Sequence, residues 1–149
     1  MSGLKPTPDQ MRTVPLAGCV VRPIRFVSVD APVDFVLAND VDVESVVADL
    51  AGYKSIALVF PKWVDGRAYS QARLLRSRFG FKGEIRATGE VLADMMPLLV
   101  RTGFDAVAMR TDQSQEIAER ALSFFPDGHY QGDVMDHQPR FRRTNGASA

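Results

Sequence analysis

The residues best placed for chemistry lie in one stretch, residues 60–73, where an apolar segment gives way to a turn and a polar helix start. The apolar segment, residues 56–60, has the composition of a buried strand. Asp65 and the glycine after it predict a tight turn, and Arg67 and Ser70 fall in the first turn of the next helix. Unpaired N–H groups and the positive end of a helix dipole point outward at such places. We therefore expect a binding site here.

Two residues of this stretch have side chains that exchange protons. Asp65 and Tyr69 are the candidate catalytic acid or base. An aspartate before a glycine is also typical of a turn that caps a helix, so that alternative stays open for Asp65. A Ser–His–Asp arrangement around Ser70 is not supported, because His129 and His137 both lie near the C-terminus.

Groups suited to an anionic substrate follow successive predicted strands. Parallel strands end at one edge of a sheet, so these groups are expected to lie together. Arg67 either faces an anion or pairs with Asp65 or a neighbouring carboxylate, because the positive end of a helix disfavours a free cation. Arg86 either binds the ligand or pairs with Asp94. The predicted substrate-binding residues are Arg67, Ser70, Arg86, Thr88 and Gly89.

The charges are balanced overall but unevenly placed. The chain has 18 basic and 18 acidic residues, yet residues 62–86 hold seven basic against two acidic ones, a local balance of +5. A basic patch on a neutral chain suits a small oxyanion or an acidic protein better than nucleic acid. Arg73, Arg76 and Arg78 are the predicted partner-docking residues, with an ordinary solvated helix face as the alternative.

Strand and helix patterns alternate along the chain, with strands beginning near residues 35, 56, 84 and 105. This alternation predicts an α/β fold in one domain, with a parallel sheet built from repeated βα units. Two architectures remain open, a half-barrel-like sheet, which we favour slightly, and an open three-layer sheet. A half barrel leaves unpaired strand edges, which predicts a homodimer.

Individual helices carry more specific signals. Asp40 or Asp42 is expected to cap the helix that ends before Gly52. Asp112, with a glutamine three residues later, predicts a capping box for a helix over 113–125. Pro97 is expected to kink a helix over 90–101. An apolar stripe on the helix after the turn consists of Ala68, Ala72, Leu75 and Phe79.

Composition sets the remaining limits. We expect an extended, proline-rich arm over 1–23, the α/β domain over 24–125 and a polar, mobile tail over 126–149. Cys19 is the chain's one cysteine, which excludes an internal disulfide and fits a cytoplasmic protein. No apolar run is long enough to span a membrane. Nucleotide-binding glycine motifs are also lacking, and we predict no cofactor and no bound metal.

Several of these motifs together resemble one bacterial family, the domain of unknown function family 934. The resemblance covers about residues 24–130 and is carried by 60–73, 75–78, 83–94 and 103–105. Members are commonly labelled oxidoreductases of sulfite reduction, a label that comes from association with sulfite and sulfate reduction genes. The chain departs from the family pattern at Met95, where glutamine is usual, and at Pro97. No catalytic residues carry over.

The resemblance implies a role in assimilatory sulfur metabolism. Sulfite reduction moves several electrons through siroheme, iron–sulfur clusters or flavin, for which this sequence has no motif. We therefore expect an accessory protein that binds a small oxyanion at Arg67, Ser70 and Arg86, or docks on sulfite reductase or another sulfur-assimilation protein. The alternatives are a stand-alone enzyme acting on a small anionic substrate and a purely structural interaction module.

Overall fold

The computed structural model describes residues 24–124 and residue 134, and it shows one five-stranded parallel sheet. The strands are β1 (Arg25–Phe26), β2 (Phe35–Leu37), β3 (Ser55–Phe60), β4 (Glu84–Gly89) and β5 (Ala106–Val107). The helices are α2 (Val43–Leu50), α3 (Arg67–Ser77), α4 (Met96–Thr102) and α5 (Gln115–Ser123), with a 3₁₀ turn, η1 (Ala93–Met95), before α4. The predicted α/β class is confirmed.

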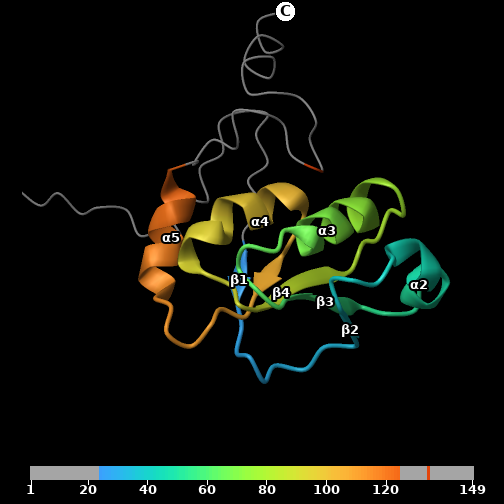
Figure 1. Ribbon diagram of the computed structural model, residues 1–149, viewed down its shortest axis with the longest axis horizontal. Helices are drawn as coiled ribbons and strands as arrows, with labels where there is room; N and C mark the ends of the chain where they lie inside the picture. Colours follow the sequence, from blue (N-terminus) through green and yellow to red (C-terminus); the bar gives the residue numbers. More distant parts are fainter. Residues whose placement is uncertain (1–23, 125–133, 135–149) are drawn as a thin grey trace, which may run out of the picture.

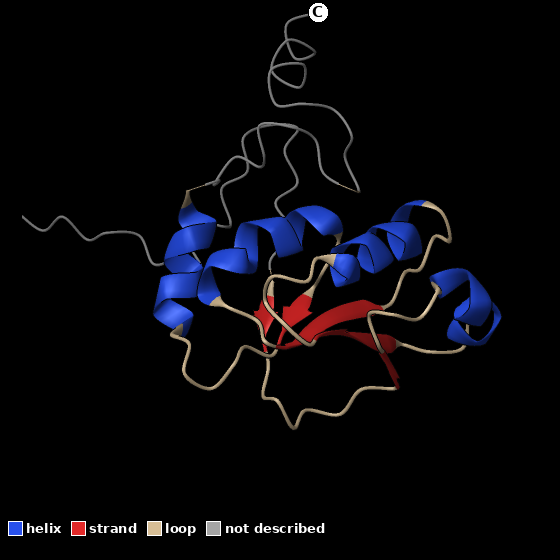
Figure 2. Ribbon diagram, in the orientation of Figure 1, coloured by secondary structure: helices blue, strands red, loops and turns tan. Residues whose placement is uncertain are grey.

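The strand order is β1-β5-β4-β3-β2, so β2 to β5 are neighbours in chain order. Each step moves one strand in the same direction, and right-handed crossovers then place every connecting helix on one face. Figure 2 shows α3, α4 and α5 together above the sheet, while the segment from β1 to β2 passes beneath it. With these helices on one face, the sheet is not the middle of a three-layer stack, and β1 and β2 form its two edges. The half-barrel-like architecture remains a prediction.

The hydrophobic core lies between the sheet and these helices. Alternate residues of β3 and β4 point toward the helices and are fully buried, as are the small side chains of α3 that meet them. The predicted stripe on α3 is confirmed at three of its positions, and Phe79 packs at the margin of the core. The central residues are Ile56, Leu58, Phe60, Ala68, Ala72, Leu75, Ile85 and Leu99.

Three local predictions meet different outcomes. The carboxylate of Asp42 accepts a hydrogen bond from the backbone N–H of Glu44 at 3.0 Å, which selects Asp42 over Asp40 as the cap of α2. The predicted capping box at Asp112 is wrong, because Ser114 caps α5 and Asp112 pairs with Arg110. Pro97 lies in the first turn of α4, where its missing N–H is not needed, so it starts a helix and does not kink one.

The predicted arm over 1–23 and tail over 126–149, apart from residue 134, lie outside the described residues. Within residues 24–124, no helix is long and apolar enough to cross a membrane. The predicted homodimer remains a prediction.

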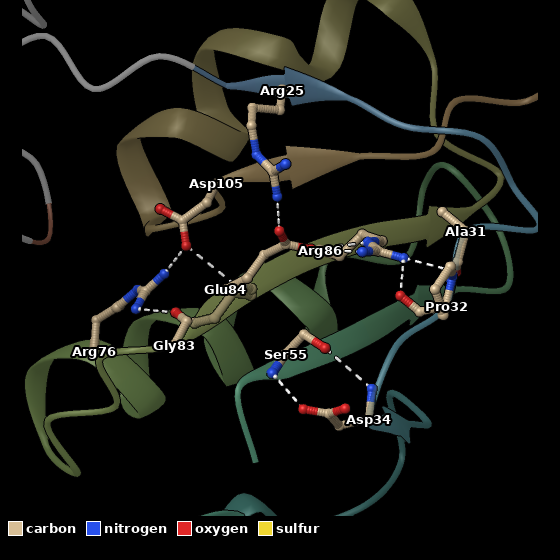
Figure 3. Close-up of polar contacts among 11 residues, drawn as sticks. Arg25, Ala31, Pro32, Asp34, Ser55, Arg76, Gly83, Glu84, Arg86 and Asp105 are labelled. Atoms are coloured by element: carbon tan, nitrogen blue, oxygen red, sulfur yellow. Dashed lines mark hydrogen bonds and ion pairs between the residues drawn. The ribbon is translucent and has the colours of Figure 1, made fainter.

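A buried guanidinium ties α3 to the sheet. The side chain of Arg76 is 5% exposed and forms an ion pair with Asp105. Its Nε donates to the carbonyl oxygen of Gly103 at 3.0 Å, and its Nη1 donates to those of Phe81 and Gly83, both at 2.8 Å (Figure 3). One side chain therefore fixes α3, the turn into β4 and the turn before β5 relative to one another.

Two other features of this cluster leave little freedom. The Asp105 carboxylate also accepts from the backbone N–H of Ile85 at 3.1 Å. Gly103 has a φ of 110°, and a Cβ there would lie 2.6 Å from Arg76 Cγ, so a side chain does not fit. Arg76 is thus unable to take part in the docking surface expected for it, because its guanidinium is buried and bonded within the fold.

Replacing Arg76 tests this cluster. We expect Arg76→Ala to lower the free energy of unfolding by about 3–5 kcal/mol, because Asp105 and three carbonyl groups lose a partner. The matched control is Arg73→Ala on the exposed face of the same helix, with an expected change within about 0.5 kcal/mol. Urea unfolding followed by circular dichroism measures both values. Equal effects of the two variants would contradict the structural role of Arg76.

Candidate functional site

The loops that follow β2, β3, β4 and β5 lie at the carboxyl edge of the sheet, as expected for parallel strands (Figure 1). They comprise residues 38–42, 61–66, 90–92 and 108–114. This edge gathers most of the predicted site residues, so its charges decide what it is able to bind.

Arg67 pairs with Asp65, the alternative that the sequence left open. Its Nη2 donates to Asp65 Oδ2 at 2.8 Å and its Nε to Asp65 Oδ1 at 3.1 Å. The backbone N–H of Arg67 donates to the same carboxylate at 3.2 Å, which tightens the start of α3. The Arg67 side chain is still 61% exposed. The pair lies at the surface, but its charges compensate each other.

Asn39, a residue that the sequence analysis missed, completes this arrangement. It is 9% exposed, and its Nδ2 donates to Asp65 Oδ2 at 2.8 Å, so the loop after β2 is tied to the loop after β3. The Arg67 side chain, followed by the Arg67 backbone N–H, holds the pKa of Asp65 well below its usual range. Asp65 therefore remains ionised at neutral pH and is poorly suited to be a catalytic acid or base. An asparagine two residues after the end of β2 was the signal for Asn39.

Tyr69, the other candidate catalytic residue, is part of the packing beneath α3. Its ring centroid lies 5.0 Å from that of Phe60 and 6.3 Å from that of Phe104. Burial, with a smaller effect of the Asp94 charge, raises the pKa of Tyr69 to about 12. The phenol therefore stays neutral at physiological pH and does not accept a proton. Ser70 is exposed on the first turns of α3.

Arg86 lies inside the sheet rather than at its edge. It points to the face opposite the helices, where its Nη2 donates to Glu84 Oε1 at 2.7 Å (Figure 3). Its Nη1 donates to the carbonyl oxygens of Ala31 at 2.9 Å and Pro32 at 3.1 Å. The side chain is 9% exposed. Glu84, and not Asp94, is thus its acidic partner.

These contacts explain what Arg86 does. Glu84 also pairs with Arg25 of β1, so one carboxylate joins two strands on the open face. The carbonyls that Arg86 holds belong to the segment that crosses this face from β1 to β2. Asp34 secures the end of that segment, because its Oδ2 accepts from the backbone N–H of Lys54 at 2.7 Å. Arg86 therefore holds this covering segment against the sheet, and its buried side chain is not accessible to a substrate.

Thr88 and Gly89 are the last two residues of β4. Thr88 is opposite Val59 in the register of the sheet, and Gly89 is opposite Phe60. Gly89 has a φ of 96°, and a Cβ there would lie 2.4 Å from the carbonyl oxygen of Phe60. The glycine is needed because the two backbones approach closely. This requirement accounts for Gly89 without a ligand.

The remaining guanidinium at this edge is also paired. Arg110 Nε donates to Asp112 Oδ1 at 2.6 Å, and its Nη2 donates to Oδ2 at 2.7 Å. Arg67 and Arg110 each face a carboxylate, while Lys62 is exposed. A paired cation attracts a further anion weakly, because most of its field is already compensated. The geometry therefore gives little support to an oxyanion site at Arg67 and Arg86.

An exposed apolar pair is the most distinctive feature of the carboxyl edge. Trp63 is 55% exposed and Val64 is 65% exposed. Both lie in residues 61–66, which we call the Trp63 loop. The loop is ordered by a bond from the Asp65 N–H to the Lys62 carbonyl oxygen at 3.0 Å, and by one from the Trp63 N–H to Glu90 Oε2 at 3.3 Å. The sequence analysis gave Trp63 no role, although a tryptophan in a polar turn was its signal.

The predicted docking residues of α3 divide into two groups. Arg73 and Arg78 are exposed, whereas Arg76 is buried. Arg78 pairs with Glu44 of α2 at 3.1 Å, and its side chain is 61% exposed. Exposed pairs of this kind are weak and exchange readily with a partner's charges. Arg73 and Arg78 therefore remain available on the surface.

A family model described as "Bacterial protein of unknown function (DUF934)" matches residues 34–141. The chain belongs to the DUF934 family. Neither the curated proteins nor the solved structures gave a match. The resemblance seen in the sequence is thereby confirmed, and the DUF934 match includes the Trp63 loop, the Arg76 cluster and Arg86.

The state of Asp65 is open to direct measurement. Its lowered pKa means that the stabilisation it contributes is present above the usual value of 3.8 and is lost as the pH falls through the folded-state pKa. NMR titration of the side-chain carboxyl carbon should show no protonation of Asp65 near pH 3.8. Arg67→Ala should raise the pH at which Asp65 is protonated toward that value, and Arg73→Ala should leave it unchanged. A normal titration in the unmodified protein would contradict the pairing.

Proposed function

We propose that this DUF934 protein is an accessory protein of assimilatory sulfite reduction that docks on sulfite reductase through the Trp63 loop. The choice of partner rests on the sulfite-reduction label of the family that the sequence resembles. The choice of surface rests on one observation, the exposure of Trp63 and Val64 on an ordered loop.

An exposed tryptophan beside an exposed valine favours protein docking. Large apolar side chains at the surface lose contact with water when a partner covers them, and tryptophan is among the residues that most often dominate binding energies. The loop is held by Glu90 and by the turn from Lys62 to Asp65, so little conformational freedom remains to be lost on binding. These properties suit an anchor on a preformed surface.

Exposed basic residues belong to the Trp63 loop and to the helix that follows it. Lys62 and Arg73 are exposed, and Arg67, although paired with Asp65, keeps its guanidinium at the surface. Cations at the rim of an interface speed association with an acidic partner and set orientation more than they add affinity. The partner surface should therefore present an apolar pocket with acidic residues at its border.

The charges and burial of the predicted site residues favour docking over an oxyanion site and over a stand-alone enzyme. An oxyanion at Arg67 or Arg86 would compete with Asp65 or Glu84, which already compensate those cations. A stand-alone enzyme would use Asp65 and Tyr69, whose pKa values are shifted away from neutral pH in opposite directions. Neither role has a specific observation in its favour.

The proposal predicts direct binding to purified sulfite reductase from the source organism. We expect Trp63→Ala to raise the dissociation constant about 30-fold or more, as for the central residue of an interface. The matched control is Ile117→Ala on α5, which removes another exposed apolar side chain, 57% exposed, from a different helix. Biolayer interferometry with immobilised reductase measures the affinities, and circular dichroism confirms that both variants are folded.

Two results would count against the proposal. Absence of binding by the unmodified protein would show that sulfite reductase is not its partner. Equal affinities of Trp63→Ala and Ile117→Ala would show that the Trp63 loop is not the docking surface. Charge reversal by Arg73→Glu should slow association and leave dissociation nearly unchanged, because a rim cation acts mainly on the encounter.

A further inference from the structure

The opposite edge of the domain contains a groove between α2 and the turn that joins α3 to β4. Its volume is about 340 Å³, within the range of small-ligand sites. It lies where α2 and α3 end, at the amino ends of β3 and β4, and shares no residue with the Trp63 loop. The lining consists of Val47, Leu50, Ala51, Tyr53, Leu75, Phe79, Gly80, Phe81, Lys82 and Gly83.

The interior of the groove is apolar. Leu50 and Leu75 are almost fully buried and form its floor, whereas Tyr53, Phe79 and Phe81 are half-buried and form its walls. Each of these three residues therefore keeps part of its surface in contact with water. A ligand with an apolar body would cover these surfaces, and the gain comes from removing them from water.

The walls are held in place without a ligand. Tyr53 stacks on Phe35 with ring centroids 5.2 Å apart. The Phe81 N–H donates to the carbonyl oxygen of Leu75 at 2.8 Å, and the guanidinium of Arg76 lies 5.9 Å from the Phe81 ring centroid. A site that is already formed loses little on binding, because its side chains are ordered beforehand.

The charge at the mouth of the groove selects the ligand. Lys82 is exposed, and none of the ion pairs among the described residues includes it. Exposed Lys54 adjoins the same turn, since its carbonyl oxygen would lie 2.5 Å from a Cβ on Gly83. Asp34 also reaches this turn, but its carboxylate is bonded to the backbone N–H groups of Lys54 and Ser55. Lys82 is therefore the cation that lines the groove itself, while the interior is apolar.

We infer that this groove binds a small amphiphilic anion, with an aromatic or branched aliphatic body against Phe79 and Tyr53 and a carboxylate or sulfonate at Lys82. The ammonium of Lys82 supplies the electrostatic preference, and the apolar walls supply the affinity. The inference is independent of docking at the Trp63 loop.

The test uses two probes that differ in charge alone at the relevant group. 8-Anilinonaphthalene-1-sulfonate has an apolar body and a sulfonate, and N-phenyl-1-naphthylamine has the same rings without it. Titration of the full chain, followed by amide NMR, should give saturable shifts from the sulfonate probe, confined to residues 47–53 and 79–83. The neutral probe should bind the same groove more weakly.

Two variants separate the contributions. Lys82→Met should weaken binding of the sulfonate about fivefold and leave the neutral probe unchanged, the size expected for an exposed charge pair. Val47→Phe should weaken both probes, because the larger ring fills the groove. Arg120→Met, which removes an exposed cation from α5, is the matched control and should change neither affinity.

Shifts outside the groove, or shifts that do not saturate, would overturn the inference. Equal binding of the two probes, or an unchanged affinity for the sulfonate in Lys82→Met, would overturn the preference for an anion.

Discussion

The domain depends on one buried cation, the guanidinium of Arg76. Its bonds to Gly103, Phe81, Gly83 and Asp105 join α3 to the turns that precede β4 and β5. A buried charge is tolerated only when its donors are fully paired, so the surrounding carbonyls must keep their positions. Phe81 and Gly83 also line the groove, and the Trp63 loop directly precedes the other end of α3, the helix that Arg76 anchors.

Pairing also determines which cations of this protein are available to a ligand. Arg67 and Arg86 both belong to the basic region of the sequence, but Asp65 and Glu84 compensate them within the fold. The cations left exposed without a described acidic partner include Lys62, Arg73 and Lys82. Lys62 belongs to the Trp63 loop, Arg73 lies on the exposed face of α3, and Lys82 lines the groove.

The face of the sheet opposite α3, α4 and α5 is covered by a single chain segment. In a closed barrel, this face would be covered by the opposite strands. Here, the segment from β1 to β2 crosses it, held in the middle by Arg86 and at its end by Asp34 (Figure 3). The hydrogen bonds of Arg86, a residue of a parallel strand, therefore hold the covering segment in place.

The sequence by itself determined the order of the elements, the parallel sheet and the buried face of α3. These follow from local periodicity and from the handedness of crossovers, which need no knowledge of distant contacts. The capping role of Asp42 and the pairing of Asp65 with Arg67 were likewise within reach, because their partners are close in the chain. The family motif also located the Trp63 loop.

Only the tertiary structure decided which polar residues are structural. Arg76 reaches Asp105 across 29 positions, and Arg86 reaches Ala31 across 55, so no local pattern identifies either partner. Asn39 lies 26 positions from Asp65, and Glu84 pairs with Arg25 across 59. The local sequence around a charged residue at a strand end is the same whether its side chain faces a ligand or a distant carboxylate. The distinction depends on packing, which brings segments together that the sequence keeps apart.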